Sequence, residues 1–227
     1  MTDQRKTFSV VGKSVPRVDA AAKVRGKALF TDDMVLPGMV YAKIKPSTVA
    51  HANIKRIDTS KALARPGVVA VITGKDSPTP FSVNDHLPTE CPLAVKKVCY
   101  YGEGIAAAAA VDEETAEEAL DLIEVEYEPL PLLLDPLVAM GQNEVRIHDF
   151  AHENISVSGY QHFGNVDDAL KNSHTVVEGT YNSSYVQNAF LEPQSALADF
   201  NPETGKLTLH TCIQLPHYTQ GTVSRAL

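Results

Sequence analysis

The sequence is poor in the features that mark disulfide-bonded, metal-thiolate and membrane-spanning proteins. Its three cysteines, Cys91, Cys99 and Cys212, are odd in number and show no Cys-x-x-Cys spacing. They therefore indicate neither a disulfide framework nor a thiolate metal site. The longest uninterrupted apolar run, residues 105–111, is far too short to cross a bilayer. We expect reduced thiols and no membrane.

Positive charge is also scarce. The chain carries 20 Lys and Arg against 28 Asp and Glu, which gives a formal net charge of -8. Because affinity for nucleic acid comes largely from Lys and Arg that displace counterions from phosphates, this balance excludes DNA and RNA as expected partners. Residues 1–6 lack the apolar core of a secretory signal, so we expect a cytoplasmic protein.

The rest of the composition is that of an ordinary folded protein. Hydrophobic residues make up 44% and charged residues 21% of the 227 positions. No Pro, Gly or Ser tract is long enough to indicate disorder. A chain of this length can form two modest layered domains or one large one, each with a buried core.

The clearest local pattern is a strand, helix, strand unit. The apolar run 105–111 predicts a strand covered on both faces, and Asp112 can cap the helix that follows. That helix carries one apolar stripe at helical spacing, made of Ala116, Ala119, Leu120 and Ile123. Residues 124–127 alternate polar and apolar and predict a second strand, which ends at Pro129.

The wider pattern predicts an α/β (α+β) fold. Strands are expected over 39–45 and 68–72, with a short helix over 60–64 between them. The prolines of residues 130–136 cannot continue a helix or a ladder, so a domain boundary follows them. Downstream we expect a helix over 165–172 capped by Asn165, strands over 175–181, 195–200 and 206–211, a turn over 201–205, and a helix starting near Thr222.

Short motifs follow one another in a specific order along nearly the whole chain. They are Gly26-Lys27-Ala28, Phe30-Thr31-Asp32-Asp33-Met34, His51-Ala52-Asn53-Ile54, Pro66-Gly67-Val68-Val69-Ala70-Val71, Tyr101-Gly102-Glu103, Ala116-Glu117-Glu118-Ala119, Phe163-Gly164-Asn165-Val166, Leu191-Glu192-Pro193 and Gln214-Leu215-Pro216. In this order they resemble the large, molybdenum-cofactor-binding subunits of the xanthine dehydrogenase and aldehyde oxidase family. Within it, residues 73–81 and 186–192 most resemble the large subunit of 4-hydroxybenzoyl-CoA reductase.

The resemblance implies an α/β-hammerhead domain followed by the beginning of a molybdenum-cofactor-binding domain. We accordingly expect an N-terminal extension over 1–16, the hammerhead over 17–135, a linker over 136–150 and an incomplete cofactor-binding domain over 151–227. In such enzymes a molybdenum ion held by a pterin dithiolene takes hydride from a substrate carbon. Electrons then pass through iron-sulfur clusters to FAD, or in reverse, on other domains or subunits.

The resemblance carries over four residues as candidates for cofactor binding: Gln187, Asn188, Glu192 and Gln214. In the xanthine-oxidising branch of the family a glutamine lies near the metal, and its position falls on Val186 here, with Gln187 next to it. A histidine that is common just before the Leu-Glu pair is replaced by Asn188. The family's glycine-rich segment and its base glutamate would lie beyond the last residue of this sequence. We therefore assign no catalytic residue and no metal ligand.

Two of these candidates, and two other polar motifs, also have a structural interpretation. Glu192 fits a buried carboxylate that satisfies neighbouring donors, and Gln214 fits equally well a buried amide that closes backbone hydrogen bonds. His148 and His152 have the spacing of zinc ligands on a helix, but without a third ligand they are interpreted as surface residues. The glycines of residues 101–104 precede a strand, which argues against a phosphate loop.

The sequence thus predicts the N-terminal part of a molybdenum-dependent oxidoreductase large subunit, catalytically incomplete alone. Its expected partners are the remainder of the molybdenum-binding subunit, an iron-sulfur subunit and an FAD subunit, in a hetero-oligomer. The expected cofactor is the molybdenum-pterin cofactor of the complete enzyme, which this chain alone need not bind. The alternatives are a non-catalytic hammerhead module that assembles such a complex, and a free-standing small-ligand-binding domain.

Overall fold

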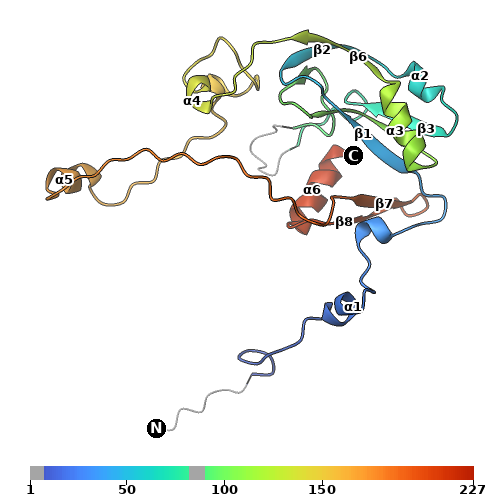
Figure 1. Cartoon of the computed structure of the whole chain (residues 1–227), viewed down its shortest axis with the longest axis horizontal. Helices are drawn as coiled ribbons and strands as arrows, with labels where there is room; N and C mark the ends of the chain where they lie inside the picture. The colour runs from blue at the N-terminus through green and yellow to red at the C-terminus, as the bar shows by residue number, and fades with distance from the viewer. Residues whose placement is uncertain (1–7, 82–89) are drawn as a thin grey trace. The chain divides into compact units, whose positions relative to one another are not determined.

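A computed structural model describes residues 8–81 and 90–227, whose helices and strands are labelled in Figure 1. The contacts within the chain divide it into two compact units. One unit consists of the described residues up to Pro37 together with Ala189–Gln214. The other consists of the described residues of Gly38–Asn188 together with Leu215–Leu227. Helices and strands are mixed along the chain, so the predicted class is confirmed. No described helix is long and apolar enough to cross a membrane.

The described strands of the larger unit form two antiparallel sheets of three strands. The first sheet has the order β1-β5-β3, with β1 at Tyr41–Pro46, β5 at Gly104–Ala110 and β3 at Val68–Thr73. The second has the order β4-β2-β6, with β4 at Lys97–Val98, β2 at Ala52–Asp58 and β6 at Glu124–Pro129. The strands predicted over 39–45, 68–72, 105–111 and 124–127 are confirmed to within a few residues.

Two strands of the second sheet, β2 and β4, were not predicted from the sequence. In β2 the pairing with β6 shifts register between Ile54 and Arg56. A bulge of this kind interrupts the two-residue alternation by which a half-buried strand is recognised. The two residues of β4, Lys97 and Val98, are too few to show any period.

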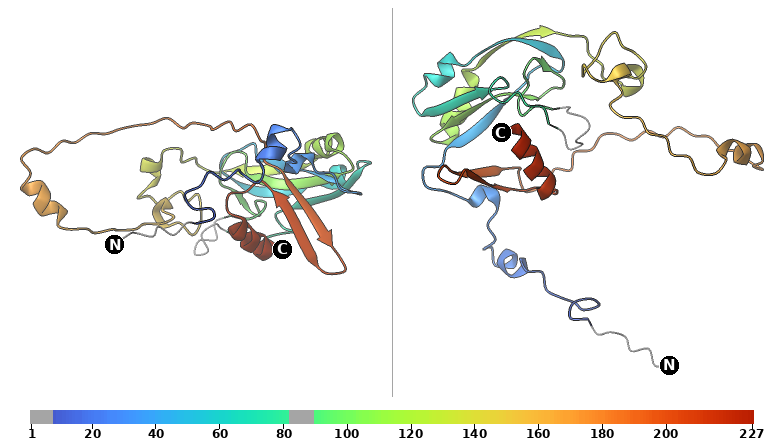
Figure 2. Two further views of the ribbon diagram at one scale, coloured as in Figure 1. Left: turned by 90° about the horizontal axis from the view of Figure 1, so that it is seen from below. Right: turned by 180° about the vertical axis from the view of Figure 1, so that it is seen from behind.

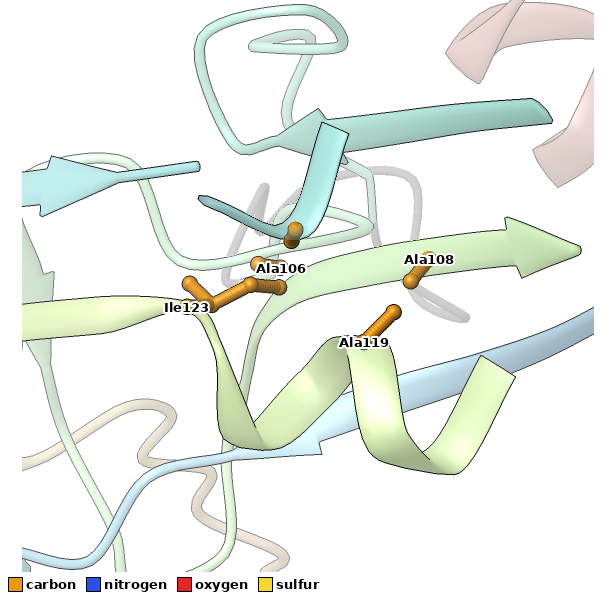
Figure 3. Close-up of a cluster of buried hydrophobic side chains, with 5 residues drawn as sticks. Ala106, Ala108, Ala119 and Ile123 are labelled. Atoms are coloured by element: carbon orange, nitrogen blue, oxygen red, sulfur yellow. The ribbon is translucent and has the colours of Figure 1, made fainter. Parts of the chain in front are cut away.

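The core of the larger unit is built from alanines of β5. Ala106 and Ala108 of this strand are fully buried, and they form one cluster with Ala119 and Ile123 (Figure 3). Ala119 belongs to helix α3, which spans Glu113–Asp121. Because alanine ends at Cβ, these residues allow the helix to approach the sheet closely.

Helix α3 begins where the sequence predicts. The Asp112 carboxylate accepts a hydrogen bond from the Thr115 N–H at 2.8 Å, as an N-cap does. Lys43 of β1 forms ion pairs with two acidic residues of this helix, Glu113 at 2.8 Å and Glu117 at 3.4 Å. The acidic residues therefore also tie the helix to the sheet.

The short helices mark the segments between the strands. Helix α2 spans Ser60–Leu63 and confirms the helix predicted over 60–64. Helix α5 spans Val166–Lys171, and Asn165 caps it as predicted by accepting a hydrogen bond from the Asp168 N–H. The remaining short helices, α1, η1, α4 and η2, were not predicted and span Ala20–Val24, Thr31–Asp33, Pro136–Ala139 and His152–Asn154.

The smaller unit contains a β-hairpin. Strands β7 (Ala196–Asn201) and β8 (Lys206–Thr211) pair antiparallel along their whole lengths (Figure 2). In the turn between them, the Asn201 side chain accepts hydrogen bonds from two backbone N–H groups, those of Glu203 and Thr204. Both predicted strands and the turn are confirmed. The hairpin could be predicted from the sequence because an Asn side chain favours a turn by accepting hydrogen bonds from the backbone that follows it.

Two predictions for the C-terminal half are wrong. Residues 175–181 form no strand. Their β-branched and aromatic residues are not sufficient, because in the described chain no neighbouring strand completes their hydrogen-bond ladder. Helix α6 spans Pro216–Ala226 and so begins well before Thr222. Pro216 occupies the first turn, where its fixed φ and missing N–H suit a helix start.

One amide side chain organises the segment between the second sheet and α5. Asn154 Nδ2 donates to three carbonyl oxygens, those of Ala139, Gln142 and Val145, at 3.2, 3.3 and 2.9 Å. Its Oδ1 accepts from the Ile147 N–H at 3.0 Å. The loop over 139–147 is therefore closed around a single half-buried residue.

Replacing Asn154 by aspartate should open this loop. The substitution turns a donor into a carboxylate that faces three carbonyl oxygens, so we expect a loss of about 1–3 kcal/mol in the free energy of local opening. Hydrogen exchange of residues 139–154 measures it. Asn143→Asp is the matched control, since Asn143 only accepts a hydrogen bond, from the Glu153 N–H, and aspartate keeps that acceptor. Equal exchange in the two variants would contradict the assignment.

Candidate functional site

The four candidate cofactor residues fall into two pairs. Gln187 and Asn188 lie in the larger unit, in a stretch without regular structure, and both are exposed. The next residue, Ala189, has a φ of 47°, a left-handed conformation that residues with a Cβ rarely adopt. Glu192 and Gln214 both lie in the smaller unit.

The hairpin brings Glu192 and Gln214 to the same end of the sheet. At this open end Ala196 pairs with Thr211, and Thr211 Oγ1 donates a hydrogen bond to the Ser195 carbonyl oxygen at 3.1 Å. Glu192 precedes this closure by a few residues and Gln214 follows it by a few. The two motifs, far apart in sequence, therefore leave the hairpin from adjacent strand ends.

Both residues differ from their structural interpretation. Glu192 and Gln214 are exposed rather than buried. An exposed carboxylate and an exposed amide are acceptors and donors available to a ligand.

A second polar cluster joins the start of the C-terminal half to the second sheet, and sequence patterns did not reveal it. Lys97 of β4 keeps only 16% of its side chain exposed. Its Nζ donates to Asp149 Oδ1 at 2.6 Å and to the Arg146 carbonyl oxygen at 3.2 Å. Cys99 Sγ donates to the Ile147 carbonyl oxygen at 3.3 Å. We call this set of contacts between 97–99 and 146–149 the latch.

Burial sets the chemistry of the groups around the latch. It raises the pKa of Cys99 to about 11, so this thiol is no nucleophile at neutral pH. It also raises the pKa of Glu103, whose carboxylate accepts a hydrogen bond from the Cys99 N–H at 2.6 Å. His148 is half-buried rather than fully at the surface, and desolvation followed by the nearby Lys97 ammonium lowers its pKa. These groups are structural.

Metal ligands do not converge at the latch. His148 and His152 do not share a helix, since η2 begins only at His152. Among the residues that the structure describes, no group of three or more His, Cys, Asp or Glu side chains is arranged to hold a metal ion.

Comparison with known proteins identifies both halves of the chain. Residues 25–131 match the family model for aldehyde oxidase and xanthine dehydrogenase, a/b hammerhead domain. Residues 147–227 match the family model for the molybdopterin cofactor-binding domain. The latch therefore joins the hammerhead to the first residues of the cofactor-binding segment.

Individual relatives carry the same two segments. The chain is 36% identical to the nicotinate dehydrogenase large molybdopterin subunit of Eubacterium barkeri, over 98% of this chain and 52% of that protein. It is 33% identical to the xanthine dehydrogenase molybdenum-binding subunit of Escherichia coli, over 93% of this chain and 29% of that protein. Quinoline 2-oxidoreductase from Pseudomonas putida matches in structure with a TM-score of 0.82, at 28% identity, over 95% of this chain and 28% of that chain. The chain thus spans about half or less of these relatives.

The pKa of His148 should report whether the latch is closed. We expect nuclear magnetic resonance titration to place the pKa of His148 below the ordinary 6.5. A pKa lowered in the closed latch means that closure is favoured above about pH 6.5 and weakens as the pH falls below it, because the open form binds the proton more tightly.

Lys97→Met should return the pKa of His148 towards 6.5, since the variant removes both the neighbouring cation and the bond to Asp149. Lys96→Met is the control, because the ion pair with Asp149 belongs to Lys97 and not to Lys96. An unchanged pKa of His148 in Lys97→Met would show that the latch does not set it.

Proposed function

The chain belongs to the xanthine dehydrogenase and aldehyde oxidase family of molybdenum-binding subunits, and we propose that it supplies the N-terminal portion of such a subunit. The observation that carries the proposal is the succession of a hammerhead match over 25–131 and a cofactor-domain match over 147–227. The division into an extension over 1–16, a hammerhead over 17–135, a linker over 136–150 and an incomplete cofactor-binding domain over 151–227 is part of it.

The residues of the hairpin suit a cofactor edge rather than a metal ion. When bound, the molybdenum-pterin group would supply the oxidation and reduction of a substrate carbon. Glu192 and Gln214 offer a carboxylate and an amide at one end of the hairpin, which match the hydrogen-bonding edge of a pterin. Gln187 and Asn188 are exposed amides of the larger unit and remain separate candidates for cofactor binding. None of these side chains is a thiolate or an imidazole, so metal ligation is left to the cofactor itself.

The complete enzyme requires more protein than this chain. Its proposed partners are the remainder of the molybdenum-binding subunit, an iron-sulfur subunit and an FAD subunit, in a cytoplasmic hetero-oligomer. Support comes from the relatives, which are named as subunits and extend well beyond the matched region. On this proposal the chain is inactive alone. The 4-hydroxybenzoyl-CoA reductase subfamily remains a prediction, because it rests on two short motifs only.

A non-catalytic assembly module is the second candidate function. The hammerhead buries its own core and needs no cofactor to do so, whereas all four candidate cofactor residues are exposed. A chain with these properties can hold other subunits together without binding the cofactor.

Native copurification from the source cell separates the two candidates. Mass spectrometry identifies the partner chains, and elemental analysis measures molybdenum and iron. Molybdenum together with a chain that carries the glycine-rich segment and the base glutamate would support the proposed enzyme. Partner chains without molybdenum would favour the assembly module. A lone chain without metal would contradict both.

Within a molybdenum-containing complex, Gln214→Ala and Glu192→Ala should each weaken cofactor retention. Loss of one hydrogen bond to the cofactor corresponds to about a tenfold loss of affinity. Molybdenum per subunit after dialysis is the measurement. Glu203→Ala is the matched control, since Glu203 lies in the turn at the opposite end of the same hairpin. If all three variants retained molybdenum equally, the open end would not be the cofactor edge.

A further inference from the structure

The short helix η1 packs against strand β7 of the β7–β8 hairpin. The hammerhead family model covers residues 25–131 and so includes η1 (Thr31–Asp33). In the structure, however, η1 packs against β7, and residues up to Pro37 form one compact unit with Ala189–Gln214. The contacts therefore connect the Phe30-Thr31-Asp32-Asp33-Met34 motif to the segment that carries Glu192 and Gln214.

The hairpin needs additional packing to be stable. A two-stranded hairpin alone is marginally stable in water. In the described chain β7 pairs only with β8, and η1 is the other element that packs closely on β7. Thr31 of η1, the adjoining Met34 and Leu197 of β7 are each half-buried. η1 thus covers part of β7, the strand that leads from the Glu192 motif.

One carboxylate holds η1 in its helical form. Asp33 Oδ2 accepts a hydrogen bond from the Phe30 N–H at 2.9 Å, and the Asp33 N–H donates back to the Phe30 carbonyl oxygen at 3.1 Å. This reciprocal pair closes the turn as a capping box does. The neighbouring Asp32 is also exposed and acidic, yet only Asp33 has this bond to Phe30.

We propose that Asp33 is a positioning residue for the cofactor edge. It holds η1 in shape, η1 supports β7, and β7 with β8 sets where Glu192 and Gln214 leave the hairpin. The inference rests on the proposed function for the identity of the ligand. The mechanical part, from Asp33 to the hairpin, is independent of any ligand.

Hydrogen exchange of the full cofactor-free chain tests the mechanical part. Asp33→Ala should raise exchange in β7 and β8 by about fivefold, the size of effect that follows loss of a helix cap. The strands β1, β5 and β3 should not change. Asp33→Asn should restore protection, because the amide oxygen still accepts from the Phe30 N–H, and Asp32→Ala should leave the hairpin protected. Unchanged hairpin exchange in Asp33→Ala, or an equal rise in all sheets, would overturn the proposal.

Molybdenum content of the native complex tests the functional part. Asp33→Ala should lower molybdenum per subunit about fivefold and Asp33→Asn should restore it. If the hairpin loosens while molybdenum is retained, Asp33 supports the hairpin without positioning the cofactor edge, and the proposal fails. If the wild-type complex contains no molybdenum at all, it is the proposed function that fails, and the hairpin exchange decides the mechanical inference separately.

Discussion

The close packing of small side chains along β5 is the constraint on which the larger unit depends. β5 pairs with β1 on one edge and β3 on the other, and its buried alanines admit helix α3 at short range. A larger side chain at Ala106 or Ala108 would push the helix away and strain both ladders. The packing of α3 against this sheet therefore holds the hammerhead domain together.

The segments that carry the candidate site lack a comparable interface. Large apolar side chains in and beside them are almost fully exposed, including Tyr181 at 92%, Tyr185 at 104% and Leu191 at 100%. Exposed apolar surface on this scale marks a place where protein is expected to pack. This contrast supports the proposal that the cofactor edge is completed by further parts of a molybdenum-binding subunit.

Elements that depend on interactions between residues close in sequence could be predicted, and elements that depend only on pairing across a sheet could not. The cap at Asp112 and the turn at Asn201 act within a few residues, so their chemistry is visible locally and both predictions are confirmed. The bulged β2 and the short β4 depend on partners across the sheet, and they were missed. Residues 175–181 show the reverse error, because a strand-like pattern without a paired neighbour forms no ladder.

The sequence by itself determined the local elements, the family and the order of the two matched segments, since hydrogen-bond caps, apolar periods and motif order are properties of neighbouring residues. Tertiary structure alone decided that Lys97 reaches Asp149 across 52 positions, that η1 packs against β7, and that Glu192 and Gln214 leave one end of a hairpin. These contacts depend on sheet register and on how elements pack, and no local pattern of residues encodes either.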